Sequence, residues 1–76
     1  MYKIKGNFSC SRNKLTSLEG CPSKVNGNFN CIYNELTSLE GCPSKVNGDF
    51  DCSRNPGNFT EEDVRKVCDV KGKIYV

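Results

Sequence analysis

The 76-residue chain contains no histidine, and this absence removes the commonest kinds of catalytic and zinc-binding site. Without histidine there is no Ser-His or Cys-His pair, which is the usual means of activating a weak nucleophile. The six cysteines include no CxxC pair, so the ligand spacings typical of zinc are missing as well. We therefore expect the protein not to be an enzyme and to carry neither a metal nor another cofactor.

The chain also lacks a long apolar run and a strong charge of one sign. Its first residues have no apolar segment like that of a signal peptide, and no later stretch has the length of a transmembrane helix. We therefore expect a cytoplasmic protein with no membrane partner. Eleven basic and nine acidic residues leave a net charge of +2, which is too balanced to indicate nucleic acid or an anionic membrane surface.

What the sequence does contain is an internal repeat. Residues 6–26 and 27–47 are the same 21-residue segment written twice, with differences at four positions. A period of about 20 to 29 residues is typical of a solenoid, in which one structural unit stacks on copies of itself and the core runs through the stack. The whole chain, residues 1–76, is then one small domain. Its predicted repeats lie near residues 4–24, 25–45 and 46–69, followed by a closing strand at 70–76.

Alternating apolar residues predict a strand in each repeat. Val25, Gly27, Phe29 and Cys31 alternate with asparagines, the period of two expected of a strand that buries one face. Two leucines and a Gly-Cys-Pro sequence then predict an irregular return segment. The same pattern predicts four short parallel strands, near residues 4–10, 25–31, 46–52 and 70–76.

The third repeat ends differently, because the sequence after its Pro-Gly pair predicts a short helix. Thr60 and Asp63 have the spacing of an N-terminal capping pair, and acidic residues follow Thr60 where the helix dipole favours them. The expected apolar stripe of this helix consists of Val64, Val67 and Cys68. We therefore predict a repeat solenoid built on a parallel β-sheet, with one short C-terminal capping helix.

The cysteines recur with the same period as the repeat. Cys10, Cys31 and Cys52 fall one period apart, as do Cys21 and Cys42, so a solenoid arranges them in two rows. Neighbours in a row would lie roughly 5 Å apart between their Cα atoms. Free, buried thiols are the favoured interpretation, because cytoplasmic thiols are normally reduced and free cysteine is among the most buried residue types. Disulfide bridges are the alternative, and a metal site is less favoured.

The repeated pattern V-x-G-x-F-x-C-x-x-N-x-L-x-x-L resembles a leucine-rich repeat. The match includes Phe29, Cys31, Asn34 and Leu36, and its pattern extends over nearly the whole chain. The segment from Leu36 to Pro43 is especially similar to short leucine-rich repeat proteins of bacteriophages, most of which have no assigned activity. The resemblance implies a strand-lined solenoid used for protein recognition and, for a phage protein, a partner in the host cell.

The resemblance also implies a structural role for the asparagines that follow the strands. Asn13, Asn34 and Asn55 recur with the period of 21 residues. In leucine-rich repeats such side chains turn inward and bond to backbone groups of a bend, where the amides have no sheet partner. We therefore interpret these three asparagines as a structural ladder and not as a binding site.

The four differences between the two copies all fall outside the inward-facing set. Stacking the repeats places such residues in outward columns across the strand face, which is the predicted binding surface for a protein partner. Arg and Tyr are frequent interface hot spots because they offer large contact areas and directed donors. Mutual cation-π packing of these side chains, or a solitary exposed isoleucine, is the simpler alternative. The predicted partner-binding residues are Arg12, Asn30, Ile32, Tyr33, Asp51, Arg54 and Tyr75.

Two other functions would use the same surface. Arg12, Tyr33 and Arg54 would suit a nucleic acid, but Asp49 and Asp51 on the same face would repel phosphates, so this partner is less favoured. The two carboxylates would lie roughly 7 Å apart, a separation found in inverting glycosidases. A flat strand face, however, provides no cleft to enclose a substrate.

A further expectation concerns the end of the stack. The first strand, residues 4–10, is an open edge whose backbone groups and apolar core end face outward. Repeat proteins normally need polar caps at their ends to stay soluble. A homodimer through this end, or a self-assembling structural protein, is therefore an alternative to a binding module.

Overall fold

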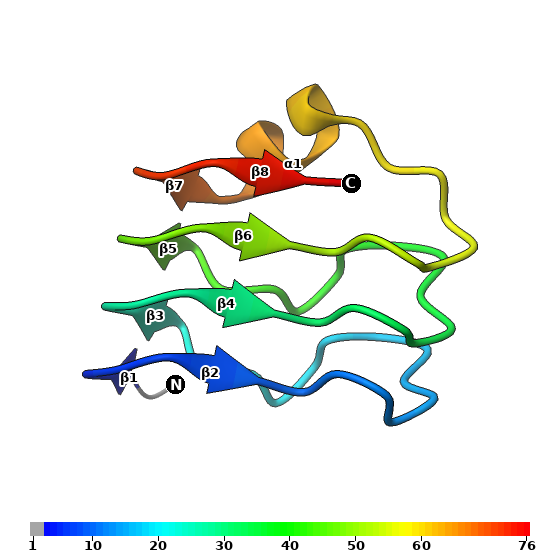
Figure 1. Cartoon of the computed structure of the whole chain (residues 1–76), viewed down its shortest axis with the longest axis horizontal. Coiled ribbons are helices and arrows are strands. Elements are labelled where there is room, and N and C mark those ends of the chain that lie inside the picture. Colours follow the sequence, from blue (N-terminus) through cyan, green and yellow to red (C-terminus); the bar gives the residue numbers. More distant parts are fainter. Residues whose placement is uncertain (1–2) are drawn as a thin grey trace.

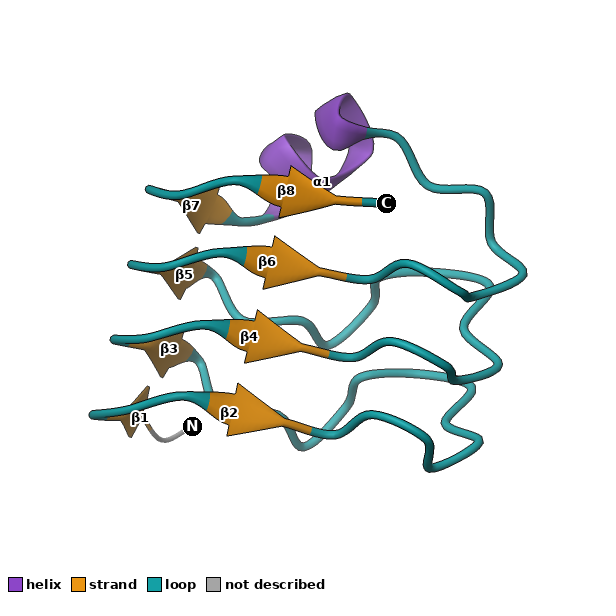
Figure 2. Ribbon diagram, viewed as in Figure 1, coloured by secondary structure: helices purple, strands orange, loops and turns teal. Residues whose placement is uncertain are grey.

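Each turn of the chain contains two short strands separated by a bend. The computed structural model describes residues 3–76. Equivalent strands of successive turns pair in parallel and form two four-stranded sheets, with the orders β1-β3-β5-β7 and β2-β4-β6-β8 (Figure 2). The strands are β1 (Lys3–Ile4), β2 (Phe8–Ser9), β3 (Lys24–Val25), β4 (Phe29–Asn30), β5 (Lys45–Val46), β6 (Phe50–Asp51), β7 (Asp69–Val70) and β8 (Ile74–Tyr75).

The turns stack in sequence order to form a β-solenoid. Figure 1 shows this order, from the blue first turn at one end to the red closing strand at the other. We refer to residues 3–23, 24–44 and 45–68 as the first, second and third turns, and to residues 69–76 as the closing segment. The predicted repeat solenoid with parallel strands is confirmed. The structure adds that each of the four expected strands is divided in two by a bend.

The bend occurs where glycines of successive turns lie directly against one another. The backbone N–H of Gly27 donates to the carbonyl of Gly6, and that of Gly48 donates to the carbonyl of Gly27, each at 3.0 Å. A Cβ atom on Gly48 would lie 2.8 Å from the carbonyl oxygen of Gly27, inside van der Waals contact. Glycine is therefore required here because the neighbouring turn occupies the space of a side chain.

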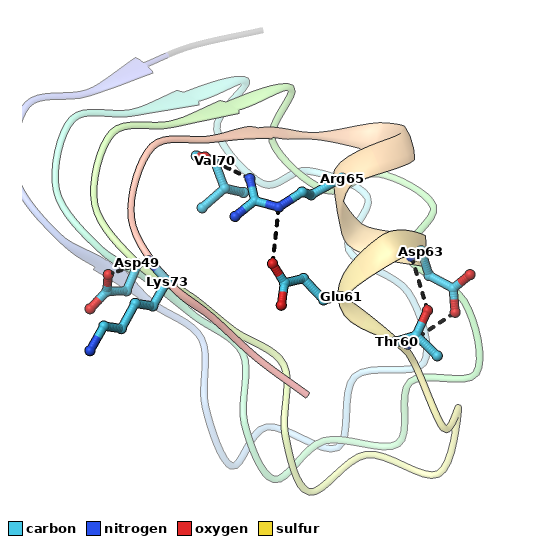
Figure 3. Close-up of polar contacts among 7 residues, drawn as sticks. All are labelled: Asp49, Thr60, Glu61, Asp63, Arg65, Val70 and Lys73. Atoms are coloured by element: carbon cyan, nitrogen blue, oxygen red, sulfur yellow. Dashed lines mark hydrogen bonds and ion pairs between the residues drawn. The ribbon is translucent and has the colours of Figure 1, made fainter.

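A ladder of side-chain oxygens runs along the same bend. The Oδ1 atoms of Asn7, Asn28 and Asp49 each accept a 2.8 Å hydrogen bond from the backbone N–H of the equivalent residue one turn later. At the last step the donor is the N–H of Lys73 (Figure 3). The ladder ends there, since a lysine side chain has no acceptor atom.

The core contains one file of aromatic rings. Phe8 and Phe29 stack with ring centroids 5.8 Å apart, and Phe29 and Phe50 follow at 5.0 Å. Phe29 and Phe50 are fully buried, whereas Phe8, at the open end, is half-buried. Burying one such side chain is worth about 1.5–3 kcal/mol, and no single turn could bury its own ring. The predicted stacking of inward residues is therefore confirmed.

The asparagine ladder is also confirmed, and Asn34 is its most complete member. Its Oδ1 atom accepts from the N–H groups of Asn13 and Leu15 in the first turn at 2.9 and 3.0 Å. Its Nδ2 atom donates to the carbonyls of Cys10 and Cys31, both at 3.0 Å. One buried amide thus joins two turns at a place where the strands have ended.

A short helix, α1 (Glu61–Val67), leads from the third turn into the closing segment and packs against β7 and β8. The predicted cap is present: the N–H of Asp63 donates to the hydroxyl of Thr60, and the N–H of Thr60 donates back to the Asp63 carboxylate (Figure 3). The predicted apolar stripe is wrong at Val67, which is 50% exposed, because this seven-residue helix buries only Val64. None of the helical structure in residues 3–76 combines the length and apolarity required of a membrane span.

All six cysteines are free thiols, and four of them are buried. Loss of hydration raises the pKa of Cys52 to about 12, with a further contribution from the nearby Asp51 carboxylate. Loss of hydration also raises the pKa of Cys68 to about 12. These thiols therefore stay protonated in the folded protein well above the ordinary cysteine value of 9.0.

The glycine bend generates a prediction with a matched control. Gly48→Ala should lower the free energy of unfolding by roughly 2–3 kcal/mol, because its Cβ would press on the backbone of Gly27. Gly6→Ala is the equivalent change in the first turn, where nothing lies within 4 Å of the new atom, and it should be neutral or slightly stabilising. Urea unfolding of both variants measures the difference. Equal losses would show that the close approach is not what requires glycine.

The buried thiols predict a loss of stability in alkali. Unfolded thiols release their protons near pH 9.0, whereas Cys52 and Cys68 in the folded state hold theirs to about pH 12. The unfolded state therefore binds fewer protons than the folded state above pH 9, and the free energy of unfolding should fall as the pH rises through this window. Urea midpoints at pH 7, 9 and 10 test this. Cys52→Ala should be less stable at pH 7 but should show a shallower alkaline decline, and an unchanged slope would contradict the assignment.

Candidate functional site

In each of the three turns, one large side chain follows the second strand at an equivalent position. Arg12, Tyr33 and Arg54, which we call the Arg-Tyr-Arg column, have φ angles of 60°, 56° and 61°. This left-handed backbone region suits glycine and costs other residues about 1–2 kcal/mol. The same unfavourable conformation recurs in three successive turns without a glycine. Strain of this kind is concentrated at functional positions, so the column is a candidate for function.

Part of the column packs against itself. The guanidinium carbon of Arg12 lies 4.3 Å from the centroid of the Tyr33 ring, a cation-π contact worth about 0.5–1 kcal/mol at an exposed site. Tyr33 nevertheless stays 44% exposed. Within residues 3–76, Arg54 has no corresponding ring contact. The simpler interpretation of mutual packing therefore accounts for Arg12 and Tyr33 but leaves Arg54 available.

The outward residues of the second sheet form a row beside this column. Strand pairing places Asn30 next to Asp51 and Asp51 next to Tyr75. Asn30 and Asp51 also have local roles, because their Oδ1 atoms accept from the N–H groups of Ile32 and Ser53 at 3.0 Å. Asn30, Ile32 and Asp51 are half-buried, whereas Tyr75 is 46% exposed.

An open hollow of about 630 Å³ lies at the end of this row. It is lined by Asp51, Ser53, Arg54, Ile74, Tyr75 and Val76. Three of the seven predicted partner-binding residues therefore meet at one depression. The hollow is open to solvent and is large enough to admit side chains of a partner.

Sequence reasoning missed that Ile74 and Val76 also line the hollow, because their alternation marks them as core residues of the last strand. The period alone does not show which inward positions become accessible at the end of the solenoid. Their position beside Tyr75 gives the hollow an apolar part, in addition to the charged groups of Asp51 and Arg54.

The two carboxylates considered for catalysis both have partners within the fold. Asp49 lies in the bend and accepts from the N–H of Lys73, whereas Asp51 lies in β6 and accepts from the N–H and hydroxyl of Ser53 at 3.0 and 2.7 Å. In the described part of the chain, no group of three or more histidine, cysteine, aspartate or glutamate side chains is placed to hold a metal ion.

Sequence reasoning also missed a row of lysines on the other sheet. Strand pairing places Lys3 beside Lys24 and Lys24 beside Lys45, and we call these three residues the lysine row. The signal that could have revealed it is their spacing of 21 residues. The charge balance of the whole chain conceals this local concentration.

Comparison with known proteins adds no family assignment. No protein-family model, curated protein or solved structure was found to match this chain.

The positive φ of the Arg-Tyr-Arg column predicts an unusual response to mutation. Arg54→Asn should leave the free energy of unfolding unchanged or raise it by up to about 1 kcal/mol, because asparagine tolerates the left-handed region. Arg54→Val should lower it by about 1–2 kcal/mol, because a β-branched side chain does not. Thermal or urea unfolding of the two variants measures this contrast. A destabilised Asn variant would mean that the arginine side chain supports the fold.

Proposed function

We propose that the protein is a protein-protein interaction module that binds its partner through the outer face of the sheet β2-β4-β6-β8 and the adjoining Arg-Tyr-Arg column. The observation that carries this proposal is the positive φ of Arg12, Tyr33 and Arg54 in three successive turns. A chain selected for stability alone would gain from glycine or asparagine there. The presence of large side chains at these three positions is explained if they contact a partner.

The chemistry of the surface favours a protein partner. Tyr33, Arg54 and Tyr75 provide aromatic area and a guanidinium group, the features most often found at interface hot spots. The hollow between Arg54 and Tyr75 also contains the Asp51 carboxylate. A surface with both charges in one depression suits the mixed side chains of a protein better than a uniformly anionic nucleic acid.

The proposal includes a location and a source for the partner. We propose that the protein acts in the cytoplasm. Following the resemblance to short bacteriophage leucine-rich repeat proteins, its partner is a host-cell protein whose activity is blocked or redirected. This step rests on the resemblance alone.

Self-association is the second candidate function. Ile4, Phe8 and Leu15 are half-buried in the first turn, although the equivalent Val25 and Phe29 in the second turn are almost fully buried. This apolar end of the core supports a homodimer through the first turn. Sedimentation at high micromolar concentration decides the matter, since a monomer at that concentration excludes the dimer.

The strand-face proposal is tested by comparing the native protein with a Tyr33→Asn/Arg54→Asn variant. Asparagine is chosen because it accepts the positive φ, so the variant should fold. The native protein should capture a protein from host-cell lysate, and the variant should bind that purified protein at least about tenfold more weakly, as expected for loss of hot-spot residues. Lys66→Asn, on the exposed side of α1, is the control and should bind normally.

Two results would count against the proposal. Equal affinity of the native protein and the double variant would exclude this surface. Capture of a nucleic acid, with binding that falls steeply as salt is added, would favour the nucleic-acid alternative at Arg12, Tyr33 and Arg54.

A further inference from the structure

The lysine row lies on the outer face of the sheet β1-β3-β5-β7. In β3, Lys24 is exposed and the adjacent Val25 is buried, so the lysine side of the strand faces solvent. Lys3 is also exposed, and Lys45 is half-buried. Because paired strands lie about 4.7–4.9 Å apart, the three side chains leave the sheet in one regular line along the solenoid.

This arrangement opposes stability. Like charges directly opposite one another on paired strands repel, and Lys24 has such a neighbour on both sides. Within residues 3–76 none of the three lysines forms an ion pair. The next position of the row, in β7, is Asp69, and its carboxylate pairs with Lys71 at 4.0 Å. The repulsion along the row is therefore not neutralised within the fold.

The surroundings extend the positive charge. The adjoining bend contributes further lysines, so the sheet β1-β3-β5-β7 and the bend together hold six lysines and two carboxylates, those of Asp49 and Asp69. Figure 3 shows Asp49 and Lys73 at the bend on one side of the solenoid and α1, whose first turn is acidic, on the other side. The net charge of +2 thus conceals this local excess of lysine. The lysines of the bend are Lys5, Lys71 and Lys73.

We propose that the lysine row binds an acidic helix of another protein. Side chains three or four residues apart on one helix face are about 5–6 Å apart, close to the spacing of the row. In an extended strand, side chains on the same face are about 6.6–6.8 Å apart. This spacing exceeds that of the row, so a strand could not place a side chain beside all three lysines. A helix lying along the solenoid axis would therefore bring one carboxylate to each of Lys3, Lys24 and Lys45.

Two features of this face favour a protein over a nucleic acid. The row ends in a negative charge at Asp69. This charge would repel the uniformly anionic backbone of a nucleic acid, whereas a protein helix could place a basic residue beside it. The outward positions of the four strands hold three lysines and Asp69, with no arginine or aromatic ring. They therefore offer neither bidentate phosphate contacts nor a stacking surface for bases.

This inference does not depend on the proposed function of the other sheet. The lysine row belongs to β1, β3 and β5, whereas the Arg-Tyr-Arg column follows β2, β4 and β6. Variants of one surface leave the other intact, so the failure of either proposal is seen separately.

The test uses two synthetic helical peptides of identical composition. One carries glutamates at every third or fourth position along a single face and a lysine at the end of that row, and the other distributes the same residues around the helix. Binding to the native protein is measured by fluorescence anisotropy at low and moderate salt. The single-face peptide should bind at least about tenfold more tightly than its rearranged form, and its affinity should fall as salt is added.

The variant Lys24→Gln/Lys45→Gln identifies the surface. It should bind the single-face peptide at least about tenfold more weakly while unfolding at an equal or higher temperature, because repulsion within the row is removed. Lys66→Gln removes one positive charge from α1, away from the row, and should have little effect on binding. A merely structural row would instead show a less stable double variant with unchanged binding.

Several outcomes overturn the inference. They are equal binding of the two peptides, no measurable binding of the single-face peptide at low salt, and equal affinity of the native protein and the double variant. Tighter binding of a single-stranded oligonucleotide than of the peptide would assign the row to nucleic acid. Self-association that is lost in the double variant would assign it to a second copy of this chain.

Discussion

The structure depends on the close stacking of successive turns at the spacing of paired strands. No turn contains a core of its own, because Phe29 is buried by Phe8 on one side and Phe50 on the other. The approach is set at the bend, where Gly27 and Gly48 let backbone meet backbone at hydrogen-bonding distance. Each inward residue must therefore pack against the equivalent residue of the next turn, and this requirement keeps the inward positions of the repeats alike.

The same stacking also brings equivalent residues together on the outside of the solenoid, where repeated residues of like charge destabilise the fold. A charged residue repeated at one outward position is placed beside its own copy, as Lys24 is beside Lys3 and Lys45, and this arrangement costs stability. The Arg-Tyr-Arg column avoids part of this cost by placing Tyr33 between two arginines. Outward positions thus indicate candidate functional surfaces in two ways. Some differ between the repeats, and others keep the same charged residue despite repulsion.

The period revealed most of the core, because inward residues are constrained by their own copies. The Phe29 file, the Asn34 ladder and the Thr60 cap all follow from spacing or local chemistry. The bend did not, since the alternation continues unbroken through Gly27 and the bend depends on contacts with the preceding turn. The positive φ of Tyr33 was equally hidden, because tyrosine gives no local signal for that conformation. The hollow required the register of strands distant in sequence, whereas the lysine row could have been found from its period of 21 residues.

The ladder of the bend gives the stack a direction that bears on how copies could associate. Each side-chain oxygen of Asn7, Asn28 and Asp49 accepts from the N–H of the following turn, and the series ends at Lys73, whose side chain has only donors. A second copy stacked on β8 in the same register would find no acceptor at Lys73 and would bring its Lys5 beside Lys71. Open-ended growth along the axis is therefore disfavoured. The proposed homodimer, with two first turns meeting end to end, would instead close after two subunits.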